Sequence, residues 1–547
     1  MIFTSFEFIA FFLIVLIGYY LIFPNLRWIW LLAASFYFYT KASPHFLPYI
    51  LSSVAVIYAS SRMIGYLDSR KASYFQKNEL TKDEKKAYNK HCTRNKKIFC
   101  ATGIILNVGM LAFTKYFNFV GESVSAITGG TFTALDIIVP LGISFYTFQS
   151  TGYLIDVYRG MYEPQKNPMK YALFILFFPQ IMQGPIGRYN DLAPQLFEPC
   201  KFDYDRLKSG LVRMLWGFFK KMVIADRAAL LVNTVFDNWK PYSGAVIWTA
   251  VFLYAVQLYA DFSGYMDIAL GAGEALGIRL SENFRTPYFS KSTAEFWRRW
   301  HITLGTWFRD YLFYPIIRTK LFQKVAKSKK LPKFVKTNLP TIAGLAVVWL
   351  ITGIWHGADW HYAAWGIYYG MIIIASSLLA PVYEKLTKLL RIKTDCFSYK
   401  LFQIVRTFLI VLVGYVLFRG NGLMAALKMI KSMFTVFNPW VFTDGTLLTL
   451  GLDAANWNVL ILSMLILLAV SIANENGINV REKIARQNII LQWICYLAGI
   501  FAVLIFGIYG PGYDVSSFLY FNFRKIHWHI SYYWNIHMRY CCPICCS

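Results

Sequence analysis

The chain has 547 residues, of which 57% are hydrophobic, 18% aromatic and only 15% charged. Soluble domains typically carry about 25% charged residues, so this composition excludes a string of soluble domains and predicts a membrane protein. The net charge of +26 does not indicate nucleic-acid binding, because the basic residues lie in loops between apolar runs. We therefore expect membrane lipids, and no nucleic acid, around this protein.

Apolar runs long enough to cross a bilayer recur from one end of the chain to the other. A span needs about 20 apolar residues to cross a hydrocarbon core of about 30 Å. Clear candidates are residues 7–23, 98–119, 244–268, 339–355, 361–380, 402–419, 456–474 and 488–509. Shorter or more polar candidates are residues 27–41, 46–61, 137–156, 169–184 and 208–225. The sequence therefore predicts an all-α, polytopic membrane protein with roughly eleven to thirteen membrane segments, the first of them a retained span rather than a removed signal peptide.

The basic loops predict how these segments are oriented. Residues 62–97 hold eleven Lys or Arg against four acids, and residues 318–336 hold eight Lys or Arg and no acid. Cytoplasmic loops retain Lys and Arg, so we expect residues 62–97 in the cytoplasm and, with three spans before them, the N-terminus outside. No Lys or Arg occurs between Lys115 and Arg159, which is typical of the external side.

Residues 281–336 are too polar to span the membrane and too aromatic for a flexible linker. Ser292 or Thr293 is a candidate N-cap with Glu295 in the first turn, which predicts a helix that continues through residues 296–301. Irregular backbone at membrane depth is tolerated only where protein or a water-filled cavity surrounds it. We therefore expect re-entrant or interfacial helices that line a cavity.

One of only eight histidines lies at the end of an apolar run. His356 follows the run 343–355, within the sequence Gly-Ile-Trp-His-Gly at 353–357. A neutral imidazole can take a proton from a hydroxyl and return it to a leaving group, and the flanking glycines let a backbone or a substrate come close. From these residues alone, a helix-capping histidine at the membrane interface beside Trp355 and Trp360 fits equally well. We count Trp355 among the candidates for substrate binding.

The sequence Phe-Trp-Arg-Arg-Trp-His at 296–301 supplies a second histidine and two arginines. An interfacial amphipathic helix, with tryptophan rings at headgroup level and arginines reaching phosphates, explains Arg298 and Arg299. Alternatively, Arg298, Arg299 and His301 line an entry for an anionic donor such as a coenzyme's phosphates. Both interpretations can hold together.

Polar groups inside the spans form a third set of candidates. Asp261 and Ser263 close a long apolar run, where they either orient a histidine or bind a sugar hydroxyl, or else pair with a nearby Lys or Arg and hold helices together. Pairing is the favoured interpretation, because charges inside a membrane bundle are almost always paired. Residues 177–188 break a span with two prolines and two glycines. Broken spans commonly line a membrane pathway, so Gln180 and Gln183 are further candidates for substrate binding.

No bound metal or tightly bound cofactor is expected. The cysteines in the body of the chain are sparse and match no zinc-site spacing. The Gly-Ala-Gly at 271–273 lacks the spacing of a dinucleotide-binding loop, and small-residue helix packing explains it. Phosphate-binding loops, serine elbows and His-Glu zinc motifs do not occur.

Six short motifs follow one another along most of the chain. They are Pro-Leu-Gly-Ile-Ser-Phe-Tyr-Thr-Phe-Gln at 140–149, Phe-Pro-Gln and Gln-Gly-Pro-Ile between 178 and 186, Lys-Lys-Met-Val-Ile-Ala-Asp at 220–226, Tyr-Ala-Asp-Phe-Ser-Gly-Tyr at 259–265, and the segments 296–301 and 353–357. In this order the chain resembles the membrane-bound O-acyltransferase family, specifically its bacterial branch of alginate O-acetylation and D-alanyl-lipoteichoic-acid transfer proteins. The resemblance extends over about residues 1–523.

The resemblance implies a fold, a location and two site residues. The fold is expected to be a ring of tilted spans around a thin centre, with a tunnel from the cytoplasm that meets an external pocket, in the bacterial cytoplasmic membrane. The histidine of the Trp-His-Gly position is catalytic in the family and maps to His356. The histidine of the Trp-Arg-Arg-Trp-His motif is functionally important and maps to His301. We therefore expect His356 to be the general base.

The expected reaction is O-acetylation of an extracellular or cell-wall polysaccharide. The resemblance implies a cytoplasmic thioester donor, acetyl-coenzyme A or an acylated carrier protein, and a secreted or membrane-anchored acetyltransferase as partner. D-alanyl transfer to teichoic acid shares the motifs, although the length of the chain favours acetyl transfer. A polysaccharide or lipid transporter without catalysis would explain the broken spans, but it predicts paired pseudo-symmetric halves that the sequence lacks.

The chain is expected to have two parts, an acyltransferase domain at 1–523 and a divergent tail at 524–547. Members of this branch tend to end close to a motif like Phe-Leu-Tyr-Phe-Asn-Phe at 518–523. The tail adds three histidines and four cysteines, whose spacing matches no metal site that we trust. We expect a divergent appendix or a reading-frame artefact and assign the tail no function.

Overall fold

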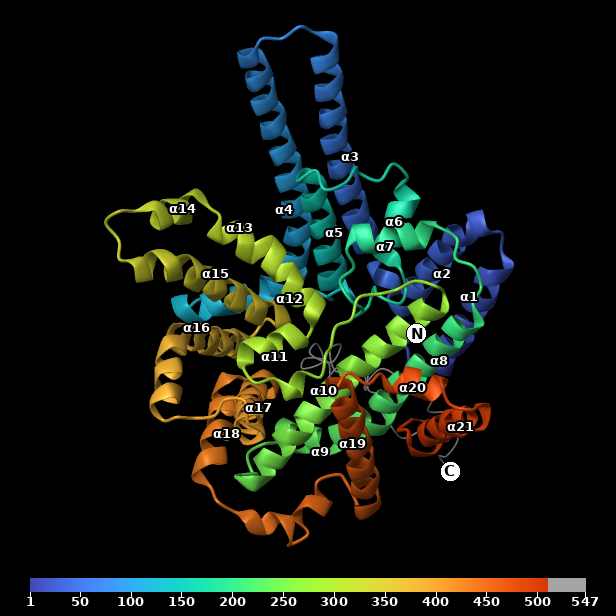
Figure 1. The fold of residues 1–547 in the computed structure, drawn as a ribbon, viewed down its shortest axis with the longest axis vertical. Helices are drawn as coiled ribbons and strands as arrows, with labels where there is room; N and C mark the ends of the chain where they lie inside the picture. The colour runs from blue at the N-terminus through green and yellow to red at the C-terminus, as the bar shows by residue number, and fades with distance from the viewer. Residues whose placement is uncertain (510–547) are drawn as a thin grey trace, which may run out of the picture.

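The computed structural model describes residues 1–509, and the motif at 518–523 and the tail at 524–547 lie outside the described residues. Within residues 1–509 the regular structure is helical, apart from one isolated antiparallel bridge between Phe284 and Trp300. The predicted all-α class is therefore confirmed. Figure 1 shows the helices gathered around α10, which runs through the middle of the molecule.

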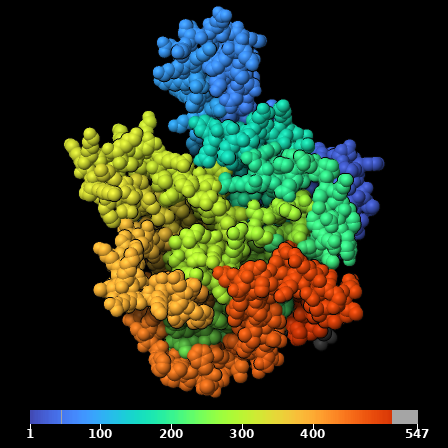
Figure 2. Space-filling model, in the orientation of Figure 1, coloured from blue at the N-terminus to red at the C-terminus, as the bar shows by residue number. Residues whose placement is uncertain are grey.

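The N-terminal part consists of two short helices and one long hairpin. Its helices are α1 (Phe6–Leu21), α2 (Arg27–Ala42), α3 (Leu47–Lys77) and α4 (Lys82–Thr128). α4 begins at a capping box, in which the Thr81 hydroxyl accepts from the Glu84 N–H and a Glu84 carboxylate oxygen accepts from the Thr81 N–H. The basic residues of 62–97 cover the end of the α3–α4 hairpin, which protrudes from the body (Figures 1 and 2).

The central part contains the predicted broken span and the most buried helix. Its helices are α5 (Ile143–Tyr158), α6 (Pro168–Leu176), α7 (Tyr189–Phe197), α8 (Tyr204–Phe218), α9 (Asp226–Asp237) and α10 (Ala245–Ala275), with a π-helical segment at Phe219–Ala225. The candidate span 169–184 ends as a helix at Leu176, because Pro179 and Pro185 cannot continue it. The break predicted for residues 177–188 is thus confirmed.

Close glycine contacts hold α8 against α10. A Cβ added to Gly271 would lie 2.5 Å from the Gly210 carbonyl oxygen, and a Cβ added to Gly217 would lie 2.6 Å from the Gly264 carbonyl oxygen. Only hydrogen side chains permit backbones to approach so closely. The prediction that Gly271 serves helix packing, rather than a nucleotide-binding loop, is confirmed.

Short helices replace a span between residues 281 and 332. They are α11 (Thr293–Arg299), α12 (Ile302–Phe308), α13 (Tyr314–Ile317) and α14 (Lys320–Lys327), with a π-helical turn at Arg309–Phe313. The Ser292 hydroxyl accepts from the Glu295 N–H at 3.1 Å, so Ser292 is the N-cap of α11, as one of the two predicted alternatives. The predicted continuation of this helix through residue 301 is wrong, because α11 ends at Arg299 and His301 has left-handed backbone.

The C-terminal part returns to long apolar helices. They are α15 (Lys333–His356), α16 (Trp360–Leu389), α17 (Phe397–Arg419), α18 (Leu423–Thr435), α19 (Ala454–Glu475), α20 (Val480–Ala485) and α21 (Ile489–Phe506). Among residues 1–509, eight helices are long and apolar enough to cross a membrane: α3, α4, α10, α15, α16, α17, α19 and α21. This number is lower than the predicted eleven to thirteen, because helices such as α1 have only 16 residues and reach about 24 Å at 1.5 Å per residue. The protein is a multi-pass membrane protein.

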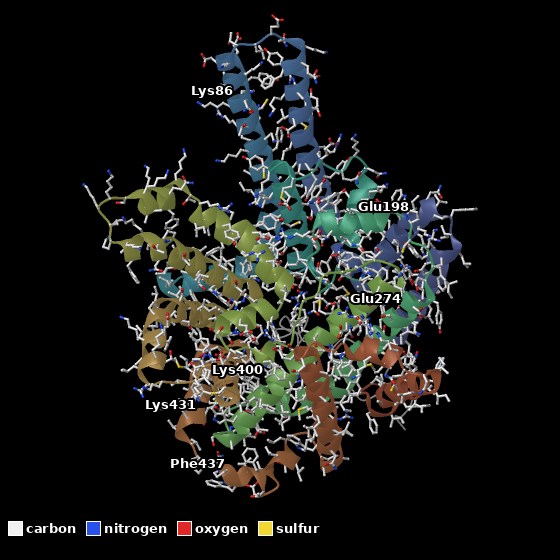
Figure 3. The ribbon with its side chains drawn as sticks, in the orientation of Figure 1. Lys86, Glu198, Glu274, Lys400, Lys431 and Phe437 are labelled. Carbon is white, nitrogen blue, oxygen red and sulfur yellow. The ribbon has the colours of Figure 1, made fainter. Side chains whose placement is uncertain are left out.

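The protruding upper end of the molecule is basic, and the loop at its lower tip lacks basic residues. Lys86 lies on the protruding α3–α4 hairpin, whereas Phe437 lies at the opposite end (Figure 3). The basic helix α14 lies in the same upper part of Figure 1 as the hairpin, and residues 436–453 at the lower end contain no Lys or Arg. This distribution is what the positive-inside rule expects for a cytoplasmic upper end.

Candidate active site

His356 is the last residue of α15, and glycines bring the next helix against it. A Cβ added to Gly353 would lie 2.4 Å from the Tyr362 carbonyl oxygen, and a Cβ added to Gly366 would lie 2.4 Å from the Trp349 carbonyl oxygen. Backbones meet at this distance only where the side chain is a hydrogen. Gly353 therefore serves the packing of α15 on α16, which sets the position of His356, rather than the approach of a substrate.

The half-buried His356 imidazole lies among aromatic rings. Its centroid is 4.6 Å from that of Trp355, 4.9 Å from Trp365 and 5.0 Å from Phe418. All three contacts are edge-on, with interplanar angles of 64°, 82° and 83°. Apolar walls of this kind keep bulk water away from an imidazole and strengthen its polar interactions with a bound group.

His301 lies at the turn between α11 and α12, in a backbone conformation that few residues adopt. Its φ is +46°, in the left-handed region, where histidine is one of the few enriched non-glycine residues. The Ile302 N–H donates to the Asn283 carbonyl oxygen at 3.1 Å, beside the bridge between Phe284 and Trp300. These contacts hold the turn, and the His301 side chain points inward with only 4% of its surface exposed. Such strained positions cluster at functional sites.

Burial determines the charge of His301. The ring of Phe262 lies edge-on to the imidazole, with centroids 4.9 Å apart, and the Phe145 ring lies 6.2 Å away. Because these apolar surroundings disfavour the imidazolium form, burial lowers the pKa of His301 far below its ordinary value. The ring is therefore neutral at physiological pH.

A single cavity of about 520 Å³ brings the two histidines together. Side chains from α10, α11, α12, α15, α16 and α17 line it, and both His301 and His356 are among them. Trp355 lies between the two imidazoles, 6.2 Å from His301 and 4.6 Å from His356 by ring centroids. Exposed Arg298 and Arg309 also line the cavity, although Arg309 pairs with Asp310 at 3.0 Å.

The two predicted arginines have different surroundings. Arg298 faces the cavity and, among residues 1–509, has no ion-pair partner. Arg299 instead pairs with Glu295 and Glu475, with nitrogen–oxygen distances of 2.7 Å in both pairs. Arg299 therefore ties α11 to α19, and the position of Arg298 is the one suited to meet an anionic donor.

Asp261 and Ser263 lie in the packing of α10 against the segment Phe219–Ala225. The Lys221 ammonium is 2.7 Å from an Asp261 carboxylate oxygen, and the Lys220 ammonium donates to the Ser263 hydroxyl at 2.8 Å. Neither Asp261 nor Ser263 lines the cavity. The contacts match the favoured interpretation of Asp261 as half of an ion pair between helices.

The remaining predicted residues do not line the cavity. Gln180 donates to the Phe174 carbonyl oxygen at 2.8 Å, and Gln183 is fully buried. Trp355 is 4% exposed and stacks on Phe148 with centroids 5.8 Å apart. Of these three candidates, Trp355 contacts both histidine rings.

Two residues of the site were missed in the sequence. Lys115 of α4 donates a hydrogen bond from its ammonium to the Trp355 carbonyl oxygen, at the end of α15. Its signal was available, because a lone lysine inside an apolar span is a functional candidate by default. Asn283, which contacts His301, carried no signal in the sequence, since it lies in a polar stretch like many other asparagines.

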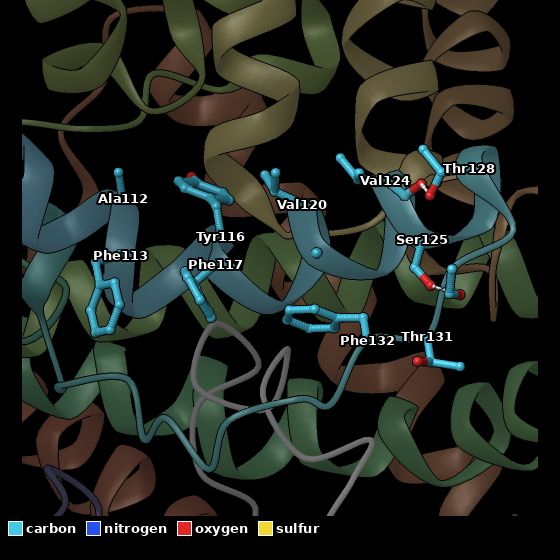
Figure 4. A pocket seen from close by; sticks show the side chains of 12 residues that line it. Ala112, Phe113, Tyr116, Phe117, Val120, Val124, Ser125, Thr128, Thr131 and Phe132 are labelled. Atoms are coloured by element: carbon cyan, nitrogen blue, oxygen red, sulfur yellow. Dashed lines mark hydrogen bonds between the residues drawn. The ribbon is translucent and has the colours of Figure 1, made fainter.

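A second hollow, of about 540 Å³, contains none of the predicted site residues. It runs along α4 and is closed by residues 130–132 (Figure 4). Its walls are mainly apolar, as expected of a groove in a membrane-spanning helix.

Known proteins resemble this chain over much of its length. The family model of the membrane-bound O-acyltransferases, MBOAT, matches residues 165–420. The probable alginate O-acetylase AlgI of Pseudomonas syringae pv. tomato is 33% identical over 449 residues, which are 81% of this chain and 77% of that protein. The peptidoglycan O-acetyltransferase of Helicobacter pylori is 30% identical over 438 residues, 75% of this chain and 74% of that protein. The teichoic acid D-alanyltransferase of Bacillus subtilis is 29% identical over 290 residues, 52% of this chain and 70% of that protein.

The chain belongs to the membrane-bound O-acyltransferase family. It is an enzyme, an O-acyltransferase with many membrane spans, and the interpretation as a transporter without catalysis is set aside. The resemblance predicted from the six motifs is thereby confirmed.

Proposed function

We propose that this enzyme takes an acetyl group from a cytoplasmic thioester and delivers it for the O-acetylation of an extracellular or cell-wall polysaccharide, in the cytoplasmic membrane of a bacterium. The observation that carries the proposal is the cavity that both His301 and His356 line, with the free charge of Arg298 at its opening. Of the three relatives named above, the alginate O-acetylase and the peptidoglycan O-acetyltransferase match 81% and 75% of this chain, whereas the D-alanyltransferase matches 52%. That difference favours acetyl transfer over D-alanyl transfer.

The cavity explains how two polar substrates meet without crossing the bilayer. A thioester donor carries charged groups that stay at the basic end, and only its acyl arm enters the cavity. The donor is acetyl-coenzyme A or an acylated carrier protein, and the phosphates of either are recognised by Arg298 and Arg309 through charge-assisted hydrogen bonds. A secreted or membrane-anchored acetyltransferase is the proposed partner that carries the acetyl group on to the polymer.

His356 acts as the general base in this proposal. The imidazole takes the proton of the acceptor hydroxyl while the oxygen attacks the thioester carbonyl carbon. The tetrahedral intermediate then collapses, the carbon–sulfur bond breaks, and the imidazolium returns the proton to the departing thiolate. The acceptor gains the acetyl ester and the donor leaves as a thiol. Holding both reactants in one cavity supplies the entropic part of catalysis, about 7–11 kcal/mol in favourable cases.

The test uses the purified protein in proteoliposomes with acetyl-coenzyme A labelled in the acetyl group. With alginate oligosaccharides as the acceptor, the wild type is expected to release coenzyme A thiol and to form a base-labile acetyl ester on a sugar hydroxyl. His356→Ala should lower that rate at least about 100-fold. His91→Ala is the matched control, because His91 is an exposed histidine on α4 far along the chain from the cavity residues. Transfer by His356→Ala at the wild-type rate would overturn the role of the base.

The chemical nature of the transferred group needs a separate measurement. Mild base treatment of cell-wall and exopolysaccharide fractions from a deletion strain and its parent releases the esterified acids. Loss of acetate in the deletion strain supports the proposal, whereas loss of D-alanine with acetate unchanged would establish the teichoic acid reaction in its place.

A further inference from the structure

One ring nitrogen of His301 is buried and unsatisfied. Nε2 has no hydrogen-bond partner within residues 1–509, although the side chain is 4% exposed. The same side chain lines the cavity of about 520 Å³. Buried polar atoms in proteins are almost always hydrogen-bonded, so an unsatisfied nitrogen on a side chain that lines a cavity points to a bound group.

The other ring nitrogen of His301, Nδ1, lies beside the side-chain oxygen of Asn283. The Asn283 side-chain oxygen accepts from the Thr303 backbone N–H at 2.9 Å and from the Thr303 hydroxyl at 2.7 Å. A backbone N–H can only donate, so the amide of Asn283 cannot be flipped in this position. His301 Nδ1 lies 3.4 Å from that same oxygen. Because the oxygen only accepts, Nδ1 must carry the hydrogen for the contact to be favourable.

We propose that Asn283 is a positioning residue that holds His301 as the Nδ1–H tautomer and so presents Nε2 to the cavity as a hydrogen-bond acceptor for an O–H or N–H group of a substrate. A neutral imidazole has one protonated nitrogen and one lone pair, so a hydrogen fixed on Nδ1 leaves the lone pair on Nε2. The low pKa that burial gives His301 agrees with a neutral ring. The inference rests on the proposed function only for the identity of the bound group.

Two groups of the proposed reaction carry the required hydrogen. One is the acceptor hydroxyl, and the other is the amide N–H of the pantetheine arm, which is close to the thioester sulfur in both acetyl-coenzyme A and acylated carrier proteins. In either case His301 orients a reactant and His356 takes the proton. The two histidines of one cavity thus have different roles.

The tautomer is measured by solid-state nitrogen-15 NMR on the full chain in proteoliposomes with labelled histidine. The spectrum of His301→Gln identifies the His301 signals by their loss. In the wild type, the Nε2 shift of a nitrogen without hydrogen is expected, and Asn283→Ala should show a mixture of both tautomers. A wild-type His301 with its hydrogen on Nε2 would refute the proposal.

The activity test separates positioning from stability. Asn283→Ala should lower kcat at least about tenfold. Thr303→Val is the matched comparison, because Thr303 shares the Asn283 oxygen and also accepts from the Ile186 N–H at 3.1 Å but does not contact the imidazole. It should lower the thermal midpoint at least as much as Asn283→Ala does while lowering kcat less. Equal losses of kcat in both variants would mean that Asn283 is only structural.

A chemical rescue gives the sharpest readout. Histidine methylated on Nδ1, placed at position 301 of the Asn283→Ala protein, has its methyl in the space that the truncation opens and can only accept at Nε2. Recovery of kcat toward the wild-type value is expected. A protein that stays as slow as Asn283→Ala, with a wild-type thermal midpoint, would contradict the role of Nε2 as an acceptor.

The source of the bound hydrogen is resolved with two probes. Acetyl-N-acetylcysteamine carries the amide N–H, and its analogue with an ester oxygen in place of that N–H does not. A wild-type preference for the amide that disappears in His301→Gln identifies the donor arm. No preference for the amide, together with a raised KM of His301→Gln for alginate oligosaccharides as the acceptor probe, identifies the hydroxyl. If the wild type transfers no acetyl group at all, the proposed function fails while the NMR result still stands.

Discussion

A methyl group added at Gly353 should disturb catalysis without touching a substrate. In Gly353→Ala the new Cβ would lie 2.4 Å from the Tyr362 carbonyl oxygen and 3.1 Å from the Cα of Gly366. Ordinary contact begins near 3.4 Å, so α15 and α16 must separate by about 1 Å. His356 is three residues further along α15 and has to move with the helix.

The magnitude follows from two effects. Overpacking of this kind costs about 1–3 kcal/mol of stability. A displacement of about 1 Å of a catalytic group can lower the rate about 100-fold. We therefore expect Gly353→Ala to lower acetyl transfer per folded molecule by about 100-fold, together with a lower thermal midpoint.

The assay compares Gly353→Ala with Gly109→Ala in proteoliposomes. Gly109 is an exposed glycine of α4, and a Cβ added there meets nothing within 4 Å among the described residues. Since alanine is the better helix former, this control should keep its rate and gain as much as about 1 kcal/mol. A Gly353→Ala protein with the wild-type rate would refute the reasoning that the helix contact positions His356.

Three further predictions follow from the charged groups. Arg298→Ala should raise the KM for acetyl-coenzyme A about tenfold or more, since a charge-assisted hydrogen bond contributes about 1.5–3 kcal/mol. Arg299→Ala should chiefly lower the thermal midpoint, because Arg299 pairs with Glu475. Asp261→Asn removes one of the two carboxylates that contact the Lys221 ammonium and should lower the yield of folded protein. The cost should be smaller than the about 3–5 kcal/mol of breaking a whole buried pair, because Asp226 remains 2.8 Å from that ammonium. Burial lowers the pKa of His301 in the folded state, so the unfolded chain binds more protons than the folded chain at low pH. The folded state should therefore lose stability as the pH falls below about 6.5, by no more than about 1.4 kcal/mol per pH unit. His301→Gln should remove this part of the loss.

The measurements for these predictions are steady-state kinetics and thermal unfolding of the detergent-solubilised protein. An unchanged KM in Arg298→Ala would exclude that residue from donor binding. Unaltered folding of Asp261→Asn would show that the pair is dispensable. A pH profile of stability that is the same in His301→Gln and in the wild type would mean that burial does not hold the ring neutral.

Much of the site could be predicted because its signals are local. His356 lies at the end of an apolar run. The N-cap at Ser292 is indicated by Glu295, three residues further along the chain. Local hydrophobicity also located the long spans, since a helix in lipid must satisfy its backbone internally whatever surrounds it. Short segments such as α1 were harder to predict as spans. Its apolar run of 17 residues forms a helix of 16 residues, which is shorter than a typical membrane span.

The partners that the site residues contact could not be predicted from local sequence. Asp261 had several candidate roles in the sequence, and only the packing of α10 placed Lys221 2.7 Å from it. Arg298 and Arg299 are neighbours in sequence with the same chemistry. On α11 they point in different directions, about 100° apart around a helix, so one faces the cavity and the other meets Glu475.

By itself the sequence determined the class of protein, the spans and the two histidines, because composition, hydropathy and short motifs act over a few residues. The tertiary structure alone decided that His301 and His356 line one cavity. It also decided that glycines bring α15 and α16 together next to His356, and that the Asn283 side-chain oxygen contacts Nδ1 of His301. Gly353 and Gly366 are 13 positions apart, Asn283 and His301 are 18 apart, and the two histidines that share the cavity are 55 apart. Contacts over such separations depend on how whole helices pack, which is a property of the folded chain and of no short stretch within it.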